Sequence, residues 1–304
     1  MIQALVITGP TASGKSGLAY ELAKQVPLEV ISVDSAQVYR GFDIGSAKPD
    51  SDQQFAVPHH LIDIRDASNP YSAADFREDA IRLIGEILGR GSLPVLVGGT
   101  MLYIKALRDG IAPLPAADQK VRSALTQEAA EHGWTGLHDR LKKIDPRAAS
   151  RINAADTQRL QRALEVYELT GKSMSQLIEA GNQPCPFDLT EIAIVPADRK
   201  LLHSRIEQRF DQMLDQGLID EVTKIRDLPG IDPGLPAMKS VGYRQVWNYL
   251  EGRCDYDEMR HKAIVATRQL AKRQYTWLRS WQNLIVLDQP ILSEALKIVR
   301  FGSI

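Results

Sequence analysis

One short segment near the start of the chain constrains the fold more than any other. It matches the pattern GxxxxGK(S/T) and consists of Gly9, Pro10, Thr11, Ala12, Ser13, Gly14, Lys15 and Ser16. An apolar run at residues 4–7 precedes it, and helical spacing follows over about residues 14–25. A strand, a glycine-rich turn and a helix in this order direct backbone amides and a helix N-terminus at phosphate oxygens. The motif therefore predicts a diphosphate site, in which the lysine neutralises charge and Ser16 can ligate Mg²⁺.

The hydrophobic pattern predicts an α/β fold. Strands are expected at residues 3–8, 29–33, 60–64, 93–99, 189–195 and 284–287, and a helix capped by Ser72 should end near Gly89 and Gly91. Strands that alternate with helices form parallel sheets covered on both faces. We therefore expect a P-loop NTPase-like parallel sheet that is flanked by helices.

The alternation stops at about Leu114 and resumes after Pro186. Helical patterns fill this stretch, and it contains no convincing strand. We predict a core domain of residues 1–115 and 187–304, interrupted by an all-helical insertion domain of residues 116–186. Long helices are expected in the core domain at residues 199–228 and 258–282.

Composition narrows the function classes only moderately. The chain has 304 residues, 44% hydrophobic and 25% charged, and a net charge of −1, which neither favours nor excludes a nucleic-acid partner. No run of 18 apolar residues occurs, and no signal pattern opens the chain, so we expect a cytoplasmic protein without a membrane span.

Cysteine and histidine give no indication of a metal centre. Cys185 and Cys254 are far apart and belong to no CxxC pair, so neither zinc nor a disulfide framework is expected. His59 and His60 are adjacent, and neighbours on a strand point to opposite faces. We therefore do not predict a metal site at this pair.

Asp34 follows the second expected strand. Ligands of open parallel sheets bind beyond the carboxyl ends of the strands, so Asp34 is a candidate general base or substrate contact. An apolar strand that ends in aspartate also suits a Mg²⁺ ligand, a role for which Asp63 competes. A third interpretation is that Asp34 is only the cap of a helix that follows.

Thr100 follows the strand at residues 93–99 and the pair Gly98-Gly99. It should therefore face the same crevice as Asp34. The alternative is a tight turn in which Thr100 only caps the next helix. Both interpretations can hold together.

Positive charge gathers near the C-terminus. From Lys239 to Arg279 the sequence has nine lysines and arginines but only four acidic residues. Helical spacing places Arg268, Lys272 and Arg279 on one face, while Ala266, Leu270, Trp277 and Trp281 lie on another. The basic face suits phosphates, although a merely solvated face has the same pattern.

Taken together, these segments resemble the bacterial tRNA dimethylallyltransferases, also called tRNA isopentenyltransferases. The resemblance extends from Gly9 to about Trp281. It rests on GPTASGKS, ISVDSAQVYRGFDIGSAKP, PHHLIDI, YSAADFR, PVLVGGTMLYIKAL, DTQRLQRALEVYELTGK, RIEQRFDQML, SVGYRQVW and ATRQLAKRQYTWLRSW, in this order.

The resemblance implies a reaction. The dimethylallyl group of dimethylallyl diphosphate moves to N6 of adenosine 37 in tRNA, and pyrophosphate leaves with Mg²⁺ as cofactor. By this resemblance Asp34 is the base and Thr100 helps to position the reactants, while Thr11, Ser16 and Arg209 contact the diphosphate. A stacked adenine cannot reach a deep crevice, so it should be flipped out of the anticodon loop. We expect the protein to be a monomer that binds tRNA, and we expect no contact with a membrane.

The same resemblance implies a set of tRNA contacts, both in the insertion and near the C-terminus. They are Asp34, Ser35, Ala36, Gln37 and Thr100; Arg122; Gln158, Arg159, Leu160, Gln161 and Arg162; Lys239, Ser240, Val241, Gly242, Tyr243 and Arg244; and Lys272, Arg273, Gln274, Tyr275, Thr276, Trp277, Leu278 and Arg279.

Two other functions fit part of the pattern. A small-molecule kinase would use the same glycine-rich loop for ATP and Asp34 for its acceptor. An RNA-binding ATPase or switch protein would use the loop and the basic helix without alkylating RNA. The long insertion and the basic C-terminal helix argue against the kinase.

Overall fold

A computed structural model describes residues 2–112, 114–179, 181 and 183–301. The chain forms two compact units. The first, called the core unit below, comprises Met1–Arg108 and Cys185–Ile304, and the second, the helical unit, comprises Asp109–Pro184. Within the described ranges, no helix combines the length and apolar character needed to cross a bilayer.

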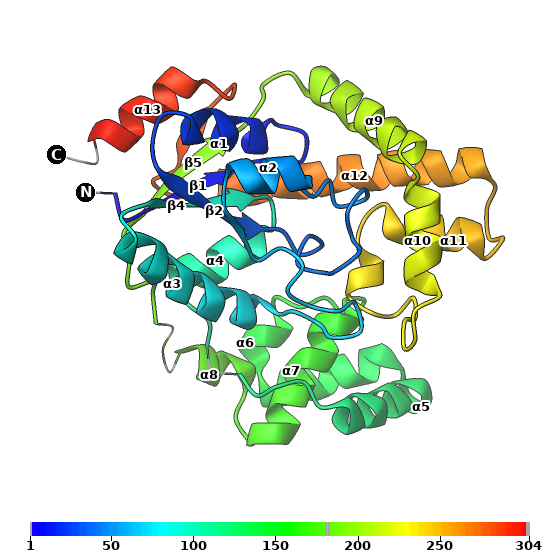
Figure 1. Cartoon of the computed structure of the whole chain (residues 1–304). Helices are drawn as coiled ribbons and strands as arrows, with labels where there is room; N and C mark the ends of the chain where they lie inside the picture. The colour runs from blue at the N-terminus through cyan, green and yellow to red at the C-terminus, as the bar shows by residue number, and fades with distance from the viewer. Residues whose placement is uncertain (1, 113, 180, 182, 302–304) are drawn as a thin grey trace. The chain divides into compact units, whose positions relative to one another are not determined.

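The core unit is built on one six-stranded sheet (Figure 1). All of its neighbouring strands are parallel, in the order β3-β2-β4-β1-β5-β6. The predicted α/β class is therefore confirmed. The strands are β1 (Ala4–Thr8), β2 (Leu28–Val33), β3 (His59–His60), β4 (Leu93–Gly98), β5 (Leu189–Ile194) and β6 (Ile285–Leu287).

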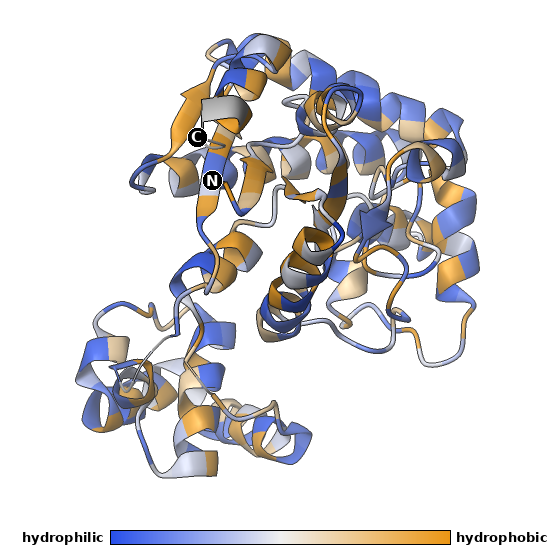
Figure 2. Ribbon diagram, turned by 60° about the vertical axis from the view of Figure 1, so that its left-hand side comes forward, coloured by the Kyte–Doolittle hydropathy of each residue, from blue (hydrophilic) through white to orange (hydrophobic). Residues whose placement is uncertain are grey.

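Alternate residues of each strand pack against different helices. Leu5 and Ile7 of β1 join a cluster with Leu18 and Leu22 of α1 (Lys15–Ala23) and with Ala295 of α13 (Leu292–Phe301). The intervening side chains of β1 face a larger cluster on the other side of the sheet. Burial on both faces explains why the central strands are continuously apolar, and Figure 2 shows the hydrophobic residues concentrated in them.

Helices of the core unit cover both faces of the sheet. α3 starts where the sequence predicts, because Ser72 and Asp75 form a capping box. Besides α1 and α13, the helices of this unit are α2 (Ser51–Ala56), α3 (Ala73–Gly89), α4 (Met101–Asp109), α9 (Arg199–Asp215), α10 (Leu218–Arg226), the short 3₁₀ helix η1 (Ala237–Lys239), α11 (Tyr243–Leu250) and α12 (Tyr256–Arg279).

Two predicted elements need correction. The single helix expected at residues 199–228 is two helices, since Gly217 adopts φ 99° between α9 and α10. This left-handed conformation is open to glycine and ends a helix. The strand expected at residues 60–64 is only His59–His60, because Leu61 and Asp63 have φ values of 62° and 55°. A strand cannot continue through positive φ.

The helical unit has its own core. Its helices are α5 (Gln119–Ile144), α6 (Pro146–Ala149), α7 (Thr157–Thr170) and α8 (Met174–Glu179). Leu125 and Leu137 of α5 pack with Leu160 and Leu164 of α7. Gly133 interrupts α5 with φ 71°. The unit is therefore formed by two packed helical segments and two short helices, stabilised by an apolar cluster of its own.

Candidate active site

A pocket of about 530 Å³ lies in the core unit, at the carboxyl ends of β1, β2 and β4. It brings together residues that the sequence predicts separately: Thr11, Ala12, Lys15, Ser16, Asp34, Ser35, Ala36, Gln37, Thr100, Arg209, Lys239, Ser240, Val241, Gly242, Arg273, Gln274 and Trp277. Carboxyl ends of parallel strands share one edge of the sheet, which is why segments distant in sequence meet here.

Lys15 and Arg209 are the two basic residues of the pocket whose pKa values burial lowers, while Lys239 and Arg273 also line it. The Lys15 ammonium donates hydrogen bonds to the carbonyl oxygens of Gly9 and Pro10, at 3.0 and 2.7 Å. Burial lowers the pKa of Lys15 to about 7, helped by Arg209 and opposed by Asp34. Burial also lowers the pKa of Arg209, again against the attraction of Asp34. Two desolvated cations beside one carboxylate make a site suited to a polyanion.

Asp34 is held by its own loop. Its Oδ1 accepts hydrogen bonds from the backbone amides of Ala36 at 2.8 Å and Gln37 at 3.3 Å. This turn orients the carboxylate while it lines the pocket. The interpretation of Asp34 as a helix cap is wrong, because turns follow it and the next helix, α2, is capped by Asp50. The Asp34 carboxylate instead holds its own turn and lines the pocket.

The Thr100 hydroxyl joins the two strand ends. It accepts a hydrogen bond of 3.1 Å from the backbone amide of Ser35, the residue after Asp34. The turn after β4 is therefore tied to the turn after β2. Thr100 lines the same pocket as Lys15 and Asp34, so it lies beside both groups that the sequence assigns to the reaction.

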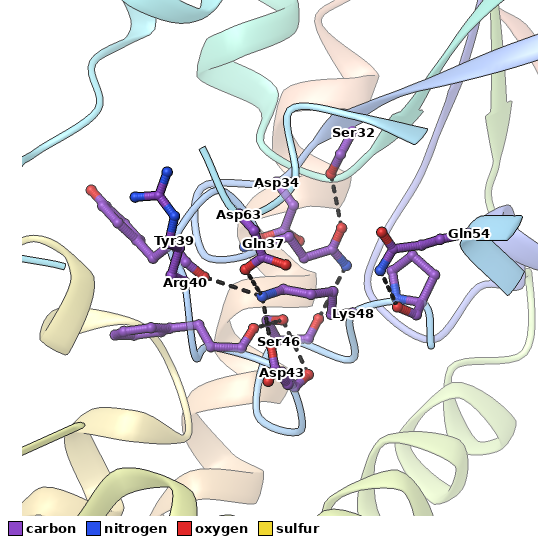
Figure 3. A network of polar contacts seen from close by, with 12 residues as sticks. Ser32, Asp34, Gln37, Tyr39, Arg40, Asp43, Ser46, Lys48, Gln54 and Asp63 are labelled. Atoms are coloured by element: carbon purple, nitrogen blue, oxygen red, sulfur yellow. Dashed lines mark hydrogen bonds and ion pairs between the residues drawn. The ribbon is translucent and has the colours of Figure 1, made fainter. Parts of the chain in front are cut away.

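A buried lysine supports the loop behind Asp34 (Figure 3). The Lys48 side chain is only 4% exposed. Its ammonium donates to Asp43 Oδ1 at 2.6 Å, to Asp63 Oδ1 at 2.5 Å and to the carbonyl oxygen of Tyr39 at 3.1 Å. All three donors of the ammonium are used. We call Lys48, Asp43, Asp63 and this carbonyl the Lys48 brace.

Gln37 connects this loop to the strand. Its Oε1 accepts from the Ser32 hydroxyl at 2.8 Å, and its Nε2 donates to the carbonyl oxygens of Ser46 and Ala47, both at 3.3 Å (Figure 3). The amide is therefore occupied within the protein. Although Gln37 lines the pocket, its side chain stabilises the loop.

Glu221 of α10 holds the other side of the same loop. Its carboxylate accepts hydrogen bonds from the backbone amides of Asp43, Ile44 and Gly45, at 3.2, 2.7 and 3.1 Å. The Tyr243 hydroxyl donates to it at 2.6 Å. Three successive amides around one carboxylate fix the backbone of the loop to α10.

Asp63 is not among the residues that line the pocket of the glycine-rich loop. Its carboxylate pairs with Lys48, and it lines a second pocket, which also includes Asp43, Lys48 and Arg209. Asp34, in contrast, shares its pocket with Lys15 and Ser16. Of the two carboxylates considered for Mg²⁺, Asp34 is therefore the one beside the glycine-rich loop.

The predicted tRNA contacts of the core unit fall into a buried group and an exposed group. Tyr243 and Leu278 are 0% and 6% exposed, so their side chains form part of the core and cannot serve as surface contacts. Lys239, Arg244, Lys272, Thr276 and Arg279 are exposed. The exposed basic residues remain candidates for phosphate contacts.

The helical unit shows the same division. Leu160 is fully buried, and Arg122 and Arg162 both pair with the buried carboxylate of Glu165. Gln161 donates to the Arg122 carbonyl oxygen at 3.0 Å. These side chains stabilise the packing of α5 on α7, whereas Gln158 and Arg159 are exposed. The burial of Leu160 does not support its predicted contact with tRNA.

The basic face of α12 is smaller than the sequence predicts. Arg268 is half-buried and pairs with Glu207 of α9 at 3.0 Å. Of the four residues predicted to pack, Trp281 is buried in the core and Trp277, which is half-buried, packs against it, while Ala266 and Leu270 are half-buried. The buried row of α12 is Met259, Ala263, Ile264, Ala271, Gln274 and Leu278.

Sequence reasoning missed several residues that shape the pocket. Lys48 lies near the end of the string ISVDSAQVYRGFDIGSAKP, and Glu221 lies in none of the quoted strings. Only tertiary contacts reveal the roles of both residues. The apolar wall formed by Ile206, Phe210 and Leu270 was also missed. The sequence places Gln274 among the tRNA contacts, but its burial could have been predicted, because it follows Ala271 by three residues and precedes Leu278 by four on one helical face.

Comparison with known proteins agrees with this geometry. Residues 37–281 match the family described as IPP transferase. A full-length tRNA isopentenylpyrophosphate transferase from Bacillus halodurans is 39% identical with a TM-score of 0.71, over 99% of this chain and 96% of that chain. A tRNA delta(2)-isopentenylpyrophosphate transferase from Staphylococcus epidermidis is 31% identical with a TM-score of 0.69, over 98% and 97%.

A more distant similarity extends to eukaryotes. A eukaryotic dimethylallyltransferase acting on tRNA is 26% identical with a TM-score of 0.77, over 91% of this chain and 70% of that chain. The family match spans most of the chain and includes Thr100, Arg209 and Gln274. The chain therefore belongs to the IPP transferase family and is a transferase.

Proposed function

We propose that this chain transfers the dimethylallyl group from dimethylallyl diphosphate to N6 of adenosine 37 in tRNA. The observation that carries the proposal is the single pocket in which Lys15, Arg209, Asp34 and Thr100 meet. Two cations suit a diphosphate, and a carboxylate suits the amine that replaces it. Family membership supports this acceptor and donor over a kinase reaction.

The residues of the pocket divide the chemistry between them. The adenine N6 lone pair forms a bond to the allylic carbon C1 while the bond between C1 and the diphosphate oxygen breaks. Negative charge grows on the leaving pyrophosphate, where Lys15, Arg209 and the loop amides stabilise it. The proton lost from N6 passes to Asp34, whose Oδ1 is already oriented by the amides of Ala36 and Gln37.

Mg²⁺ fits the oxygen donors of this pocket. Ser16 offers a hydroxyl and Asp34 a carboxylate, and Mg²⁺ is commonly held by one or two protein oxygens together with phosphate oxygens and water. The ion would be held by Ser16 and the diphosphate, and it would neutralise leaving-group charge. The structure shows no cluster of three His, Cys, Asp or Glu side chains that could hold a metal ion within residues 2–112, 114–179, 181 and 183–301.

We further propose that Lys272 and Arg279, two of the exposed basic residues of α12, contact tRNA phosphates. The predicted contacts at Gln158 and Arg159 belong to the same proposal. A cytoplasmic location and a monomeric state remain predictions from the sequence.

In the proposed complex with tRNA, a flipped adenosine would meet Asp34 and Thr100, which lie at the carboxyl ends of two adjacent strands.

Nucleoside mass spectrometry tests the function directly. Unmodified tRNA is incubated with the protein, Mg²⁺ and dimethylallyl diphosphate, then digested and analysed for N6-isopentenyladenosine. We expect this product together with pyrophosphate. A parallel incubation with ATP and nucleoside acceptors tests the kinase alternative, and phosphorylation without alkylated tRNA would refute the proposal.

A further inference from the structure

Gln274 is a buried polar residue whose side-chain amide connects two loops of the pocket. It lies on α12 and is 5% exposed. Its Oε1 accepts a hydrogen bond of 2.9 Å from the backbone amide of Thr11. Its Nε2 donates a hydrogen bond of 2.8 Å to the carbonyl oxygen of Gly99. One side chain therefore bridges the glycine-rich loop after β1 and the turn after β4.

These two partners belong to the two halves of the proposed reaction. Thr11 lies in the loop that is predicted to hold the diphosphate, and Gly99 directly precedes Thr100. The fit is close, because a Cβ atom on Gly99 would lie 2.4 Å from Gln274 Nε2. Since both partners are backbone groups, the bridge constrains the paths of both loops.

The bridge also explains which residues of α12 can meet a ligand. Leu270, Arg273 and Trp277 line the pocket with Gln274. Arg273 is also exposed, as are Lys272, Thr276 and Arg279, which do not line the pocket. Gln274 thus lies beneath the basic face that is proposed for tRNA. Its buried amide is already engaged at both ends within the described structure, which leaves it poorly suited to contact tRNA.

We propose that Gln274 is a positioning residue that fixes the diphosphate loop relative to the turn carrying Thr100. The proposal rests on the proposed function and assigns a role within that same site. If the loops moved apart, the buried amide would lose a hydrogen-bond partner and leave an unsatisfied polar group, which costs free energy. The bridge therefore holds the two loops at a fixed relative position. This fixed position of the loops sets the distance between dimethylallyl diphosphate and the adenine that accepts the dimethylallyl group.

The test compares the Gln274→Met variant with the wild-type protein. Methionine has a similar length and no amide, so both hydrogen bonds are lost with little change in volume. We expect the pyrophosphate Kd, measured by calorimetry, and the KM for dimethylallyl diphosphate each to rise about tenfold, and kcat to fall by about the same factor. The Kd for tRNA should stay unchanged.

Ser280→Ala is the matched control. Ser280 directly follows α12, and its hydroxyl donates to the Trp277 carbonyl oxygen at 2.7 Å, so this variant also loses a hydrogen bond of this helix but not the bridge. It should retain the wild-type pyrophosphate Kd and the wild-type KM. If both variants change these constants equally, Gln274 only stabilises the helix and the proposal is wrong.

Two further outcomes would also overturn the proposal. One is a raised Kd for tRNA with an unchanged Kd for pyrophosphate, which would make Gln274 an acceptor contact. The other is wild-type kinetics in Gln274→Met. If the wild-type protein fails to alkylate tRNA, the proposed function is wrong, but the pyrophosphate measurement still decides whether Gln274 positions the loop.

Discussion

The Lys48 ammonium lies 2.5 Å from Oδ1 of Asp63. This ion pair explains why two aspartates that follow apolar segments have different roles. Asp63 is bound to a buried cation behind the loop, whereas Asp34 lines the pocket with Lys15 and Ser16. A carboxylate in use as a structural partner is a poor candidate for proton transfer, so the chemistry is expected at Asp34.

Asp34→Asn should remove the base and leave the loop intact. The amide oxygen of asparagine can still accept hydrogen bonds from the backbone of Ala36 and Gln37, but it cannot take up the N6 proton. We expect kcat to fall by about 10² to 10⁴, with the Kd for tRNA unchanged. Asp52→Asn, an exposed change on α2, is the control. A parallel rise in tRNA Kd would indicate a binding role instead.

Binding of the diphosphate should be accompanied by proton uptake at Lys15. Burial lowers its pKa to about 7, so the free protein carries a mostly neutral lysine above that pH. A bound anion favours the charged form and raises the pKa. Proton uptake should therefore be larger at pH 8 than at pH 6, a range chosen to span the roughly neutral pKa.

Calorimetry in buffers of different ionisation enthalpy measures this uptake. Dimethylallyl diphosphate serves as the ligand, and Lys15→Arg is the control, because arginine stays charged at every pH used. The variant reports proton exchange by the ligand alone. Equal uptake by the wild type and by Lys15→Arg would show that Lys15 is already protonated in the free protein.

Lys48→Met should destabilise the loop behind Asp34. It leaves Asp43 and Asp63 without their shared cation, although both carboxylates are partly exposed and can be hydrated. We expect the free energy of unfolding to fall by about 2 kcal/mol and kcat to fall more than donor affinity. Lys24→Met, which removes an exposed pair with Glu21, should cost less than about 1 kcal/mol.

The outcome is measured by urea unfolding and by steady-state kinetics at saturating donor. A Lys48→Met protein with wild-type stability would contradict the importance of the brace. A loss of stability with unchanged kcat would show that Asp34 is held well enough by the amides of its own turn.

The salt dependence of tRNA binding should distinguish the basic residues of α12 that contact phosphates from the one that pairs within the protein. Replacing Lys272 and Arg279 by alanine should reduce the slope of log K against log salt by about one for each lost phosphate contact. Arg268→Ala should change it little, because Arg268 pairs with Glu207. Fluorescence titrations over a range of salt concentrations measure the slopes. A larger effect from Arg268 than from Lys272 would contradict this assignment.

The sequence by itself determined the elements that depend on local chemistry. The glycine-rich loop, the apolar strands and the capping box at Ser72 are encoded within a few residues, since strand burial, loop conformation and helix start are short-range properties. The carboxyl-edge rule then predicted that Asp34 and Thr100 share one crevice. Both line the pocket with Lys15.

Only the tertiary structure decided which polar side chains face a ligand and which are used internally. Periodicity places Lys272 and Gln274 on one helix but does not reveal that Gln274 reaches Thr11 and Gly99 from 263 and 175 positions away. The partners of Lys48 and Glu221 were equally hidden. Long-range hydrogen bonds depend on how the elements pack, and a single sequence records composition and local pattern but not that packing.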